Sequence, residues 1–181
     1  MILLAVKGMR VFNEDTKLHA ELLELLPGLR RYAYSLCGTA ADADDLCQSV
    51  IERILDKGVP EDVVLAKWAF RICRNLWIDQ YRASQTREQA VDNPLLQEMH
   101  ISDDSHRTEH EIQLQQVHNA MLELSEEQRS ALSLVTLQSM SYKDAAEVLD
   151  VPVGTVMSRI ARARANLIKY LNSQQTFVPG H

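Results

Sequence analysis

The stretch "MSYKDAAEVLDVPVGTVMSRIARARANL" (residues 140–167) places two short helical patterns on either side of a corner that is too small for an ordinary loop. Ser141 can cap the first helix, because its hydroxyl can accept a hydrogen bond from a free N–H of the first turn. Asp150 occupies the corner, where the backbone commonly turns left-handed, and Asp adopts that conformation more readily than most residues. Pro152 presets the backbone where the second helix begins, and we expect this helix to run from about 153 to 171. The spacing predicts a helix-turn-helix.

The second helix of this pair has one apolar face and one small, basic face. At helical spacing, the apolar side chains stack as Val156, Ile160, Ala163 and Leu167. The opposite face has no acidic residue, and we expect Ser158 and Arg162 to contact base edges in the major groove. Thr155, Arg159 and Lys169 are better placed for backbone phosphates. The complete predicted DNA-binding set of this helix is Thr155, Met157, Ser158, Arg159, Ala161, Arg162 and Lys169. A helical hairpin with solvated arginines is the alternative interpretation.

A second basic stretch, "KWAFRICRNLWIDQYR" (residues 67–82), combines positive charge with aromatic rings. Helical spacing gathers a basic side, formed by Lys67, Arg71, Arg74, Asn75, Ile78 and Arg82. Beside it lies an aromatic strip, formed by Phe70, Trp77 and Tyr81. Basic groups follow a phosphate backbone, and aromatic faces can stack on unpaired bases. We therefore expect this surface to hold single-stranded or melting DNA, with Trp68 in the core. In the alternative interpretation, all the rings are core and the arginines are solvated.

The stretch "DADDLCQSVIERIL" (residues 42–55) predicts an acidic amphipathic helix. Its apolar side consists of Leu46, Val50 and Ile54, and its exposed side consists of Asp44, Asp45, Gln48 and Glu52. Such a face repels DNA and suits a positively charged protein surface.

Composition favours an all-α protein of two small helical domains. The 181 residues include only six glycines and five prolines, and 46% are hydrophobic, which is enough for a core in each domain. We place the first domain at 18–86, a flexible acidic linker at 87–111 and the second domain at 112–172. The linker has seven acidic residues against two arginines.

The net charge of −6 argues against a protein that binds DNA by itself, but the charge is unevenly distributed. Residues 67–87 contain five basic residues and one acid, and residues 154–170 contain four basic residues and no acid. We expect the free chain to bind duplex DNA poorly, because its acidic remainder opposes binding.

The chain has no pattern that predicts a signal peptide, a membrane span or a metal site. We therefore expect a cytoplasmic protein without membrane insertion and without a cofactor. Cys37, Cys47 and Cys73 are widely spaced, so we interpret them as reduced structural thiols. The linker histidines are interpreted as solvated; they are His100, His106 and His110.

Residues 124–167 resemble region four of the bacterial extracytoplasmic-function sigma factors, group IV of the sigma-70 family. The "L-S/P-x-x-x-R" lead-in is present as "LSEEQR", and the "G-T-V-x-S-R-x-x-R-A-R" motif is present from Gly154 to Arg164. Two positions depart from the family pattern, since Asp150 replaces the usual glycine and Ala145 replaces a larger aliphatic residue. The resemblance implies that this domain reads the minus-thirty-five promoter element.

The two earlier stretches resemble sigma region two, so that the resemblance covers about 18–171. In that family, "D-A-E-D-L-V-Q-E" helices dock on the clamp helices of the RNA polymerase largest subunit, and "W-L-x-R-I-A-R-N-x-x-I-D" helices recognise and open the minus-ten element. The residues implied for polymerase binding are Asp44, Asp45, Leu46, Gln48 and Glu52. Those implied for minus-ten DNA are Lys67, Arg71, Arg74, Asn75, Ile78 and Arg82. The loop at 56–64 lies near where the family captures a flipped base.

The resemblance implies an alternative sigma factor, which is not an enzyme. Its implied partners are core RNA polymerase, promoter DNA and an anti-sigma factor. The implied contacts with polymerase are at the clamp helices and the flap region. One rival hypothesis is a helix-turn-helix regulator that binds a two-fold operator without polymerase. A nucleic-acid enzyme is a weaker rival, because no P-loop, HExxH or paired zinc motif is present.

Overall fold

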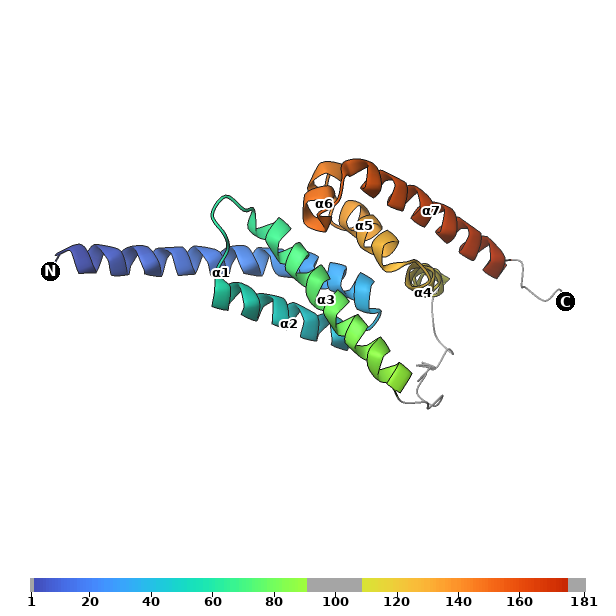
Figure 1. The fold of residues 1–181 in the computed structure, drawn as a ribbon, viewed down its shortest axis with the longest axis horizontal. Helices are drawn as coiled ribbons and strands as arrows, with labels where there is room; N and C mark the ends of the chain where they lie inside the picture. Colours follow the sequence, from blue (N-terminus) through green and yellow to red (C-terminus); the bar gives the residue numbers. More distant parts are fainter. Residues whose placement is uncertain (1, 91–108, 176–181) are drawn as a thin grey trace.

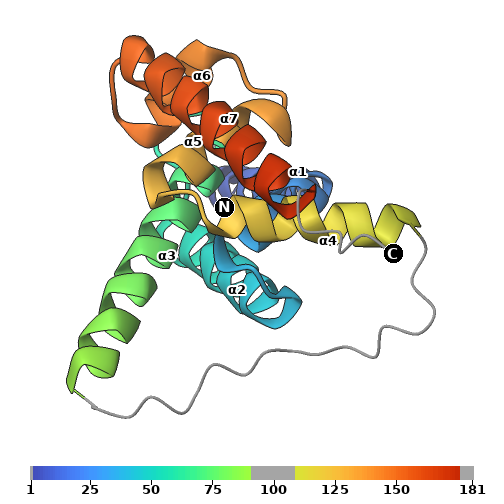
Figure 2. The same ribbon diagram turned by 90° about the vertical axis from the view of Figure 1, so that its right-hand side faces the viewer.

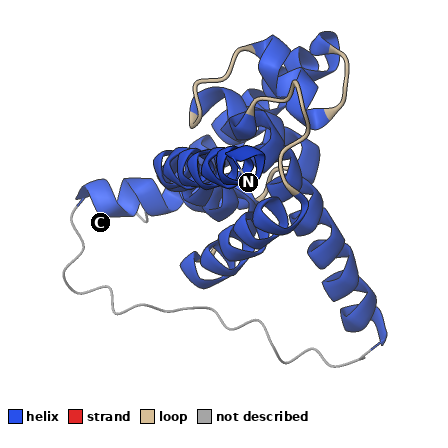
Figure 3. Cartoon of the chain, turned by 90° about the vertical axis from the view of Figure 1, so that its left-hand side faces the viewer, coloured by secondary structure: helices blue, strands red, loops and turns tan. Residues whose placement is uncertain are grey.

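A computed structural model describes residues 2–90 and 109–175 of the chain, with side chains over 16–80 and 113–173. Within these residues the chain is helical and has no strand (Figures 1 and 3). The helices are α1 (Ile2–Cys37), α2 (Ala40–Lys57), α3 (Leu65–Ala90), α4 (Glu109–Leu122), α5 (Glu126–Thr136), α6 (Tyr142–Leu149) and α7 (Val153–Gln175). None of the helices in this part of the chain has the length and apolar character needed to cross a bilayer. The predicted all-α class is confirmed.

The first helical group consists of α1, α2 and α3, which contact one another in all three pairs. Thr39 caps α2 by accepting a hydrogen bond from the N–H of Asp42 at 3.2 Å, and Gly58 ends the helix. The predicted apolar side of α2 is confirmed, because Leu46, Val50 and Ile54 are all completely buried.

The second helical group contains the predicted helix-turn-helix in α6 and α7. Ser141 caps α6 as expected, accepting from the N–H of Asp144 at 3.1 Å. Asp150 has φ 53° and ψ 52°, the left-handed conformation that the sequence predicted for the corner. The apolar face of α7 is buried through Val156, Ile160 and Ala163, and α7 packs against α4, α5 and α6.

Helices extend beyond the predicted domain bounds at three places. α1 begins at Ile2, well before the start that we placed at Leu18. α3 continues to Ala90 and α4 begins at Glu109, so helices extend into both ends of the predicted linker. The rest of the linker, with two of its three histidines, His100 and His106, lies outside the described residues.

The two groups pack directly on each other, which the linker pattern did not predict. α1 contacts α4 and α5, while α3 contacts α6, so the second group covers one side of the first (Figures 1 and 2). Tyr32 of α1 is fully buried at this interface, and its hydroxyl lies 2.6 Å from the hydroxyl of Ser130 on α5. Arg129 reaches across the same interface and donates to the carbonyl of Leu36 at 2.8 Å.

The end of α1 also depends on this packing. Gly38 follows the helix with a φ of +88°, a conformation that residues with a side chain rarely adopt. A Cβ at this position would lie 3.0 Å from Leu122 of the second group. The carbonyl of Gly38 lies 3.0 Å from Nε2 of His118, whose ring stacks on Tyr34.

The left-handed corner generates a first prediction. Asp150→Gly should be more stable than Asp150→Ala by about 1 kcal/mol, because only glycine adopts a positive φ without steric cost. Urea unfolding of both variants measures this difference. Equal stability of the two variants would show that the corner relaxes to another conformation.

The buried hydroxyl pair generates a second prediction. Tyr32→Phe should destabilise the protein by about 1 to 2 kcal/mol, because it leaves the buried Ser130 hydroxyl without its partner. Tyr34→Phe is the matched control, since Tyr34 lies on the same helix and is 39% exposed. Urea unfolding should separate the two variants; equal midpoints would mean that the hydroxyl pair adds nothing to the interface.

Candidate nucleic-acid and polymerase interfaces

The predicted DNA-reading face of α7 lies on the outside of the second helical group. Met157, Ala161, Arg162 and Lys169 are exposed, and Thr155, Ser158 and Arg159 are half-buried. The Ser158 hydroxyl donates to the carbonyl of Thr155 at 2.9 Å, so its oxygen remains able to accept a bond from a base. α7 contains no acidic residue. This face therefore presents small and basic groups to any surface that approaches it.

The predicted single-strand surface of α3 is covered in part by α6. The ammonium of Lys67 lies 2.5 Å from an oxygen of Asp144 and 2.6 Å from an oxygen of Glu147, both on α6. The guanidinium of Arg71 donates to the backbone carbonyl of Glu147. Two predicted DNA contacts are thus occupied by the protein's own acceptors.

These contacts shift the pKa values of Lys67 and Asp144 in the directions that favour the charged form of each. The ammonium of Lys67 donates hydrogen bonds to Asp144 and to Glu147, and these bonds, the one to Asp144 first, raise the pKa of Lys67 above its ordinary value. The hydrogen bond from Lys67, followed by that from Ser141, lowers the pKa of Asp144. The Lys67–Asp144 pair is therefore charged at neutral pH, and it weakens as pH falls through the lowered pKa of Asp144 or rises through the raised pKa of Lys67.

Farther along α3, the structure corrects one prediction. Ile78 is only 8% exposed, so it packs inward rather than lying on the DNA surface. Arg74 is half-buried and Asn75 is exposed, whereas the side chain of Arg82 lies outside the described residues.

The prediction that Phe70 and Trp77 stack on bases is wrong in this conformation. Phe70 is 2% exposed and meets Tyr32 edge-to-face with ring centroids 5.3 Å apart. Trp77 is 7% exposed, and the guanidinium carbon of Arg129 lies 5.8 Å from its ring centre. Trp68 packs against the core, as predicted. The side chain of Tyr81, the third ring of the strip, lies outside the described residues.

The acidic face of α2 remains open. Asp45, Gln48 and Glu52 are exposed, and Gln48 donates to Glu52 at 2.9 Å. Asp44 is exposed too, but Arg30 binds both of its oxygens at 2.5 and 2.8 Å. Leu46, which we included in the polymerase-binding set, is completely buried and supports the helix from the core instead.

Sequence reasoning missed the residues that join the two helical groups. Arg129 is the arginine of the "L-S/P-x-x-x-R" lead-in, and it donates to the carbonyls of Leu122, Leu124 and Leu36. The motif signalled an important arginine but not that it crosses to the other group. Asp144 and Glu147 gave no signal at all, because acids on a short helix are ordinarily solvated.

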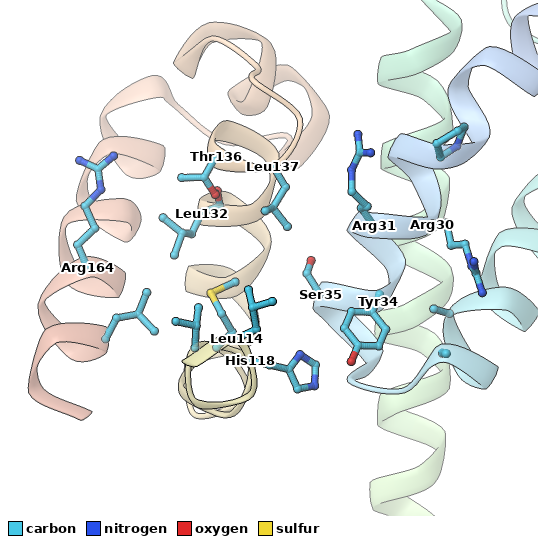
Figure 4. A pocket seen from close by; sticks show the side chains of 16 residues that line it. Arg30, Arg31, Tyr34, Ser35, Leu114, His118, Leu132, Thr136, Leu137 and Arg164 are labelled. Atoms are coloured by element: carbon cyan, nitrogen blue, oxygen red, sulfur yellow. The ribbon is translucent and has the colours of Figure 1, made fainter. Parts of the chain in front are cut away.

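An apolar groove of about 960 Å³ runs between the two groups (Figure 4). Leu114, Val117 and Leu137 line it and are 70%, 46% and 43% exposed, which is unusual for large apolar side chains. Its charged lining residues are all arginines, namely Arg30, Arg31 and Arg164. The groove therefore favours an apolar occupant with acidic flanks.

The described residues contain no group of three or more His, Cys, Asp and Glu side chains that could hold a metal ion. The three cysteines are unpaired, and two of them are buried. Burial raises the pKa of the Cys47 thiol to about 11 and that of Cys37 to about 12. These thiols are therefore protonated and weakly reactive at neutral pH.

Two family matches cover both helical groups. Residues 22–87 match Sigma-70 region 2, and residues 114–167 match Sigma-70, region 4. The extracytoplasmic-function (ECF) RNA polymerase sigma factor EcfG of Rhodopseudomonas palustris is 34% identical over 167 residues, which cover 90% of each chain. The ECF sigma factor SigM of Mycobacterium tuberculosis is 33% identical over 153 residues, covering 83% of this chain and 74% of the relative.

Solved structures agree with the sequence relatives. The sigma factor RpoE of Bartonella quintana, crystallised with the anti-sigma factor NepR, superposes with a TM-score of 0.73 at 31% identity, covering 86% of this chain and 97% of that one. CnrH, in complex with the cytosolic domain of CnrY, has the same fold, with a TM-score of 0.60 over 91% of this chain and 90% of that one, at 24% identity. Region 2 thus corresponds to α1 to α3 and region 4 to α4 to α7, and the relatives match along nearly the whole length. The chain therefore belongs to the ECF sigma factors, the alternative sigma subunits that bind core RNA polymerase and direct initiation at their promoters.

Proposed function

We propose that the outer face of α7 reads the minus-thirty-five element, with Arg162 and Ser158 at base edges and Thr155, Arg159 and Lys169 at phosphates. The observation that carries this assignment is an exposed, acid-free helix face held at a fixed angle by the left-handed corner at Asp150. Arg162 is exposed and long enough to donate to guanine. Met157 and Ala161 lie on the same exposed face.

The basic side of α3 holds the minus-ten region as it opens. Lys67, Arg71 and Arg74 supply the charge, and exposed Asn75 supplies a polar contact. The protein catalyses no step itself, because binding energy from captured bases and phosphates offsets the lost stacking of the duplex. The preceding loop, where Val64 is 60% exposed, adds an apolar surface next to this helix.

The acidic face of α2 docks on core polymerase at the clamp helices, and the second helical group binds the flap region. Asp45 and Glu52 are exposed and form no ion pair within the described residues, so their charge is available to a basic partner. Asp44 is partly neutralised by Arg30, which reduces its share of this attraction.

An anti-sigma factor controls the chain, and both act in the cytoplasm. The RpoE relative binds the anti-sigma factor NepR, which supports a comparable partner here. The arginine-flanked groove of Figure 4 suits an amphipathic helix of such a partner.

Run-off transcription with purified core polymerase and a promoter library tests the proposed function as a whole. A promoter-dependent transcript is expected only when this chain is added. A tight, polymerase-independent complex with a two-fold duplex site would instead support the helix-turn-helix regulator, the rival function.

The assignment of Arg162 generates a third prediction. Arg162→Ala should reduce discrimination between the preferred and a mismatched minus-thirty-five element by about 1 to 3 kcal/mol, because it removes the guanine donor. Lys169→Ala, which removes the same charge from a proposed phosphate contact on the same helix, should weaken all sequences alike. Run-off transcription on paired promoters measures the ratio; an unchanged ratio in Arg162→Ala would remove this residue from the reading surface.

The open face of α2 generates a fourth prediction. The double variant Asp45→Arg, Glu52→Arg should weaken binding to core polymerase by about tenfold or more, because like charges would then face the clamp helices. The control is Glu61→Arg, which reverses an exposed charge in the loop after α2. Fluorescence titration with core polymerase gives both affinities, and equal affinities would move the docking surface away from α2.

A further inference from the structure

We propose that Met157 reads the C5-methyl group of a thymine in the minus-thirty-five element, so that α7 selects bases by an apolar contact as well as by hydrogen bonds. The inference rests on the proposed role of α7 in promoter reading and adds to it the chemical group that Met157 recognises. Met157 is then a specificity-determining residue in its own right, separate from Arg162 and Ser158.

Met157 is a large apolar side chain at a position where the fold does not use one. It is 54% exposed, whereas Val156 and Ile160, which lie on the apolar face of the same helix, are 0% and 2% exposed. The core of the described residues takes Val156, Ile160 and Ala163 from α7 and leaves Met157 outside. Packing within the described residues therefore does not account for a methionine here.

Met157 belongs to an apolar row that runs beside the polar row of the reading face. Val153, Met157 and Ala161 follow one another at intervals of four residues, and all three are exposed. Ser158 and Arg162, each one residue further along, form the row that we propose to meet base edges by hydrogen bonds. Because the two rows are neighbours on the helix surface, a DNA groove that meets one of them also meets the other.

The major groove offers an apolar group that this row can recognise. Thymine presents a C5-methyl group there, next to its O4 acceptor, and apolar side chains contact that methyl group. Methionine has no hydrogen-bond donor and only a weakly accepting sulfur, so it gains most by covering an apolar surface. Its unbranched, flexible chain also adapts to the shape of the surface that it covers.

The position of Met157 along α7 favours a base contact over a backbone contact. α7 begins at Val153, so Met157 lies in its second turn, and recognition helices contact base edges through their N-terminal residues. Thr155 and Arg159, two residues before and after Met157, are the proposed phosphate contacts. Phosphate contacts fix the register of a helix in the groove, which brings the side chain between them to a base edge.

Templates that differ by one methyl group test the contact in the complete holoenzyme. The minus-thirty-five element is first recovered with the wild-type chain, core polymerase and a promoter library. Each thymine on either strand of that element is then replaced singly by deoxyuridine, which keeps the O4 acceptor but lacks the C5-methyl group. Thymine and deoxyuridine templates of different run-off length compete in one reaction, and the ratio of the two transcripts measures methyl discrimination.

The wild-type chain should favour thymine over deoxyuridine by about three- to fivefold at a position of the element, the effect of covering one methyl group. Met157→Gln should abolish this preference, because it keeps the length and helix propensity of the side chain but replaces its apolar end with an amide. Met157→Leu should retain the preference, since leucine is apolar. Ile168→Ala is the control, because Ile168 is an apolar residue of the same helix, 61% exposed and about 16 Å further along the axis. This variant should keep the wild-type ratio.

Transcription that responds to no deoxyuridine substitution would overturn the proposal, and so would a recovered element without thymine on either strand. A preference that survives in Met157→Gln would assign the methyl group to another residue. Equal loss of both transcripts in Met157→Gln, with their ratio unchanged, would place Met157 against polymerase instead of DNA. Failure of the proposed function is a separate result, because wild type would then give no promoter-dependent transcript on any thymine template.

Discussion

The arrangement of the two helical groups depends on the burial of one polar side chain. Tyr32 has no solvent exposure, and a phenol hydroxyl in that position needs a hydrogen-bond partner. Ser130 supplies that partner from the second group at 2.6 Å. Burial also raises the pKa of Tyr32, so the hydroxyl stays protonated and the pair stays neutral. In the same arrangement, with α5 against α1, α6 lies against α3.

This packing divides the functional surfaces into open and covered ones. α7, which we propose to read duplex DNA, and α2, which we propose to meet polymerase, both present exposed faces, whereas α3, proposed for opened DNA, is partly covered by α6. The covering contacts include ion pairs from Lys67 to Asp144 and Glu147, whose side chains are 26%, 37% and 46% exposed, respectively.

Arg129 shows how a family motif can serve packing as well as function. Its guanidinium donates to three carbonyls and lies over Trp77, so it joins the start of α5 to the end of α1 and to α3. Arginine suits this position because its fixed fork can satisfy several carbonyls at once. Trp77 itself is 7% exposed and part of the core, so this aromatic residue in a basic stretch is not a stacking surface here.

The sequence by itself determined the local features: the helical class, the cap at Ser141, the left-handed corner at Asp150 and the buried stripe of α7. These follow from periodicity and backbone chemistry, which act over a few residues. The sequence motifs also identified the three candidate surfaces on α2, α3 and α7. Only the tertiary structure decided which side chains of α3 turn inward, that Leu46 is core, and that Lys67 meets Asp144 and Glu147, residues roughly 80 positions away in the chain. Contacts at that separation depend on how complete surfaces fit together, and no local pattern encodes that fit.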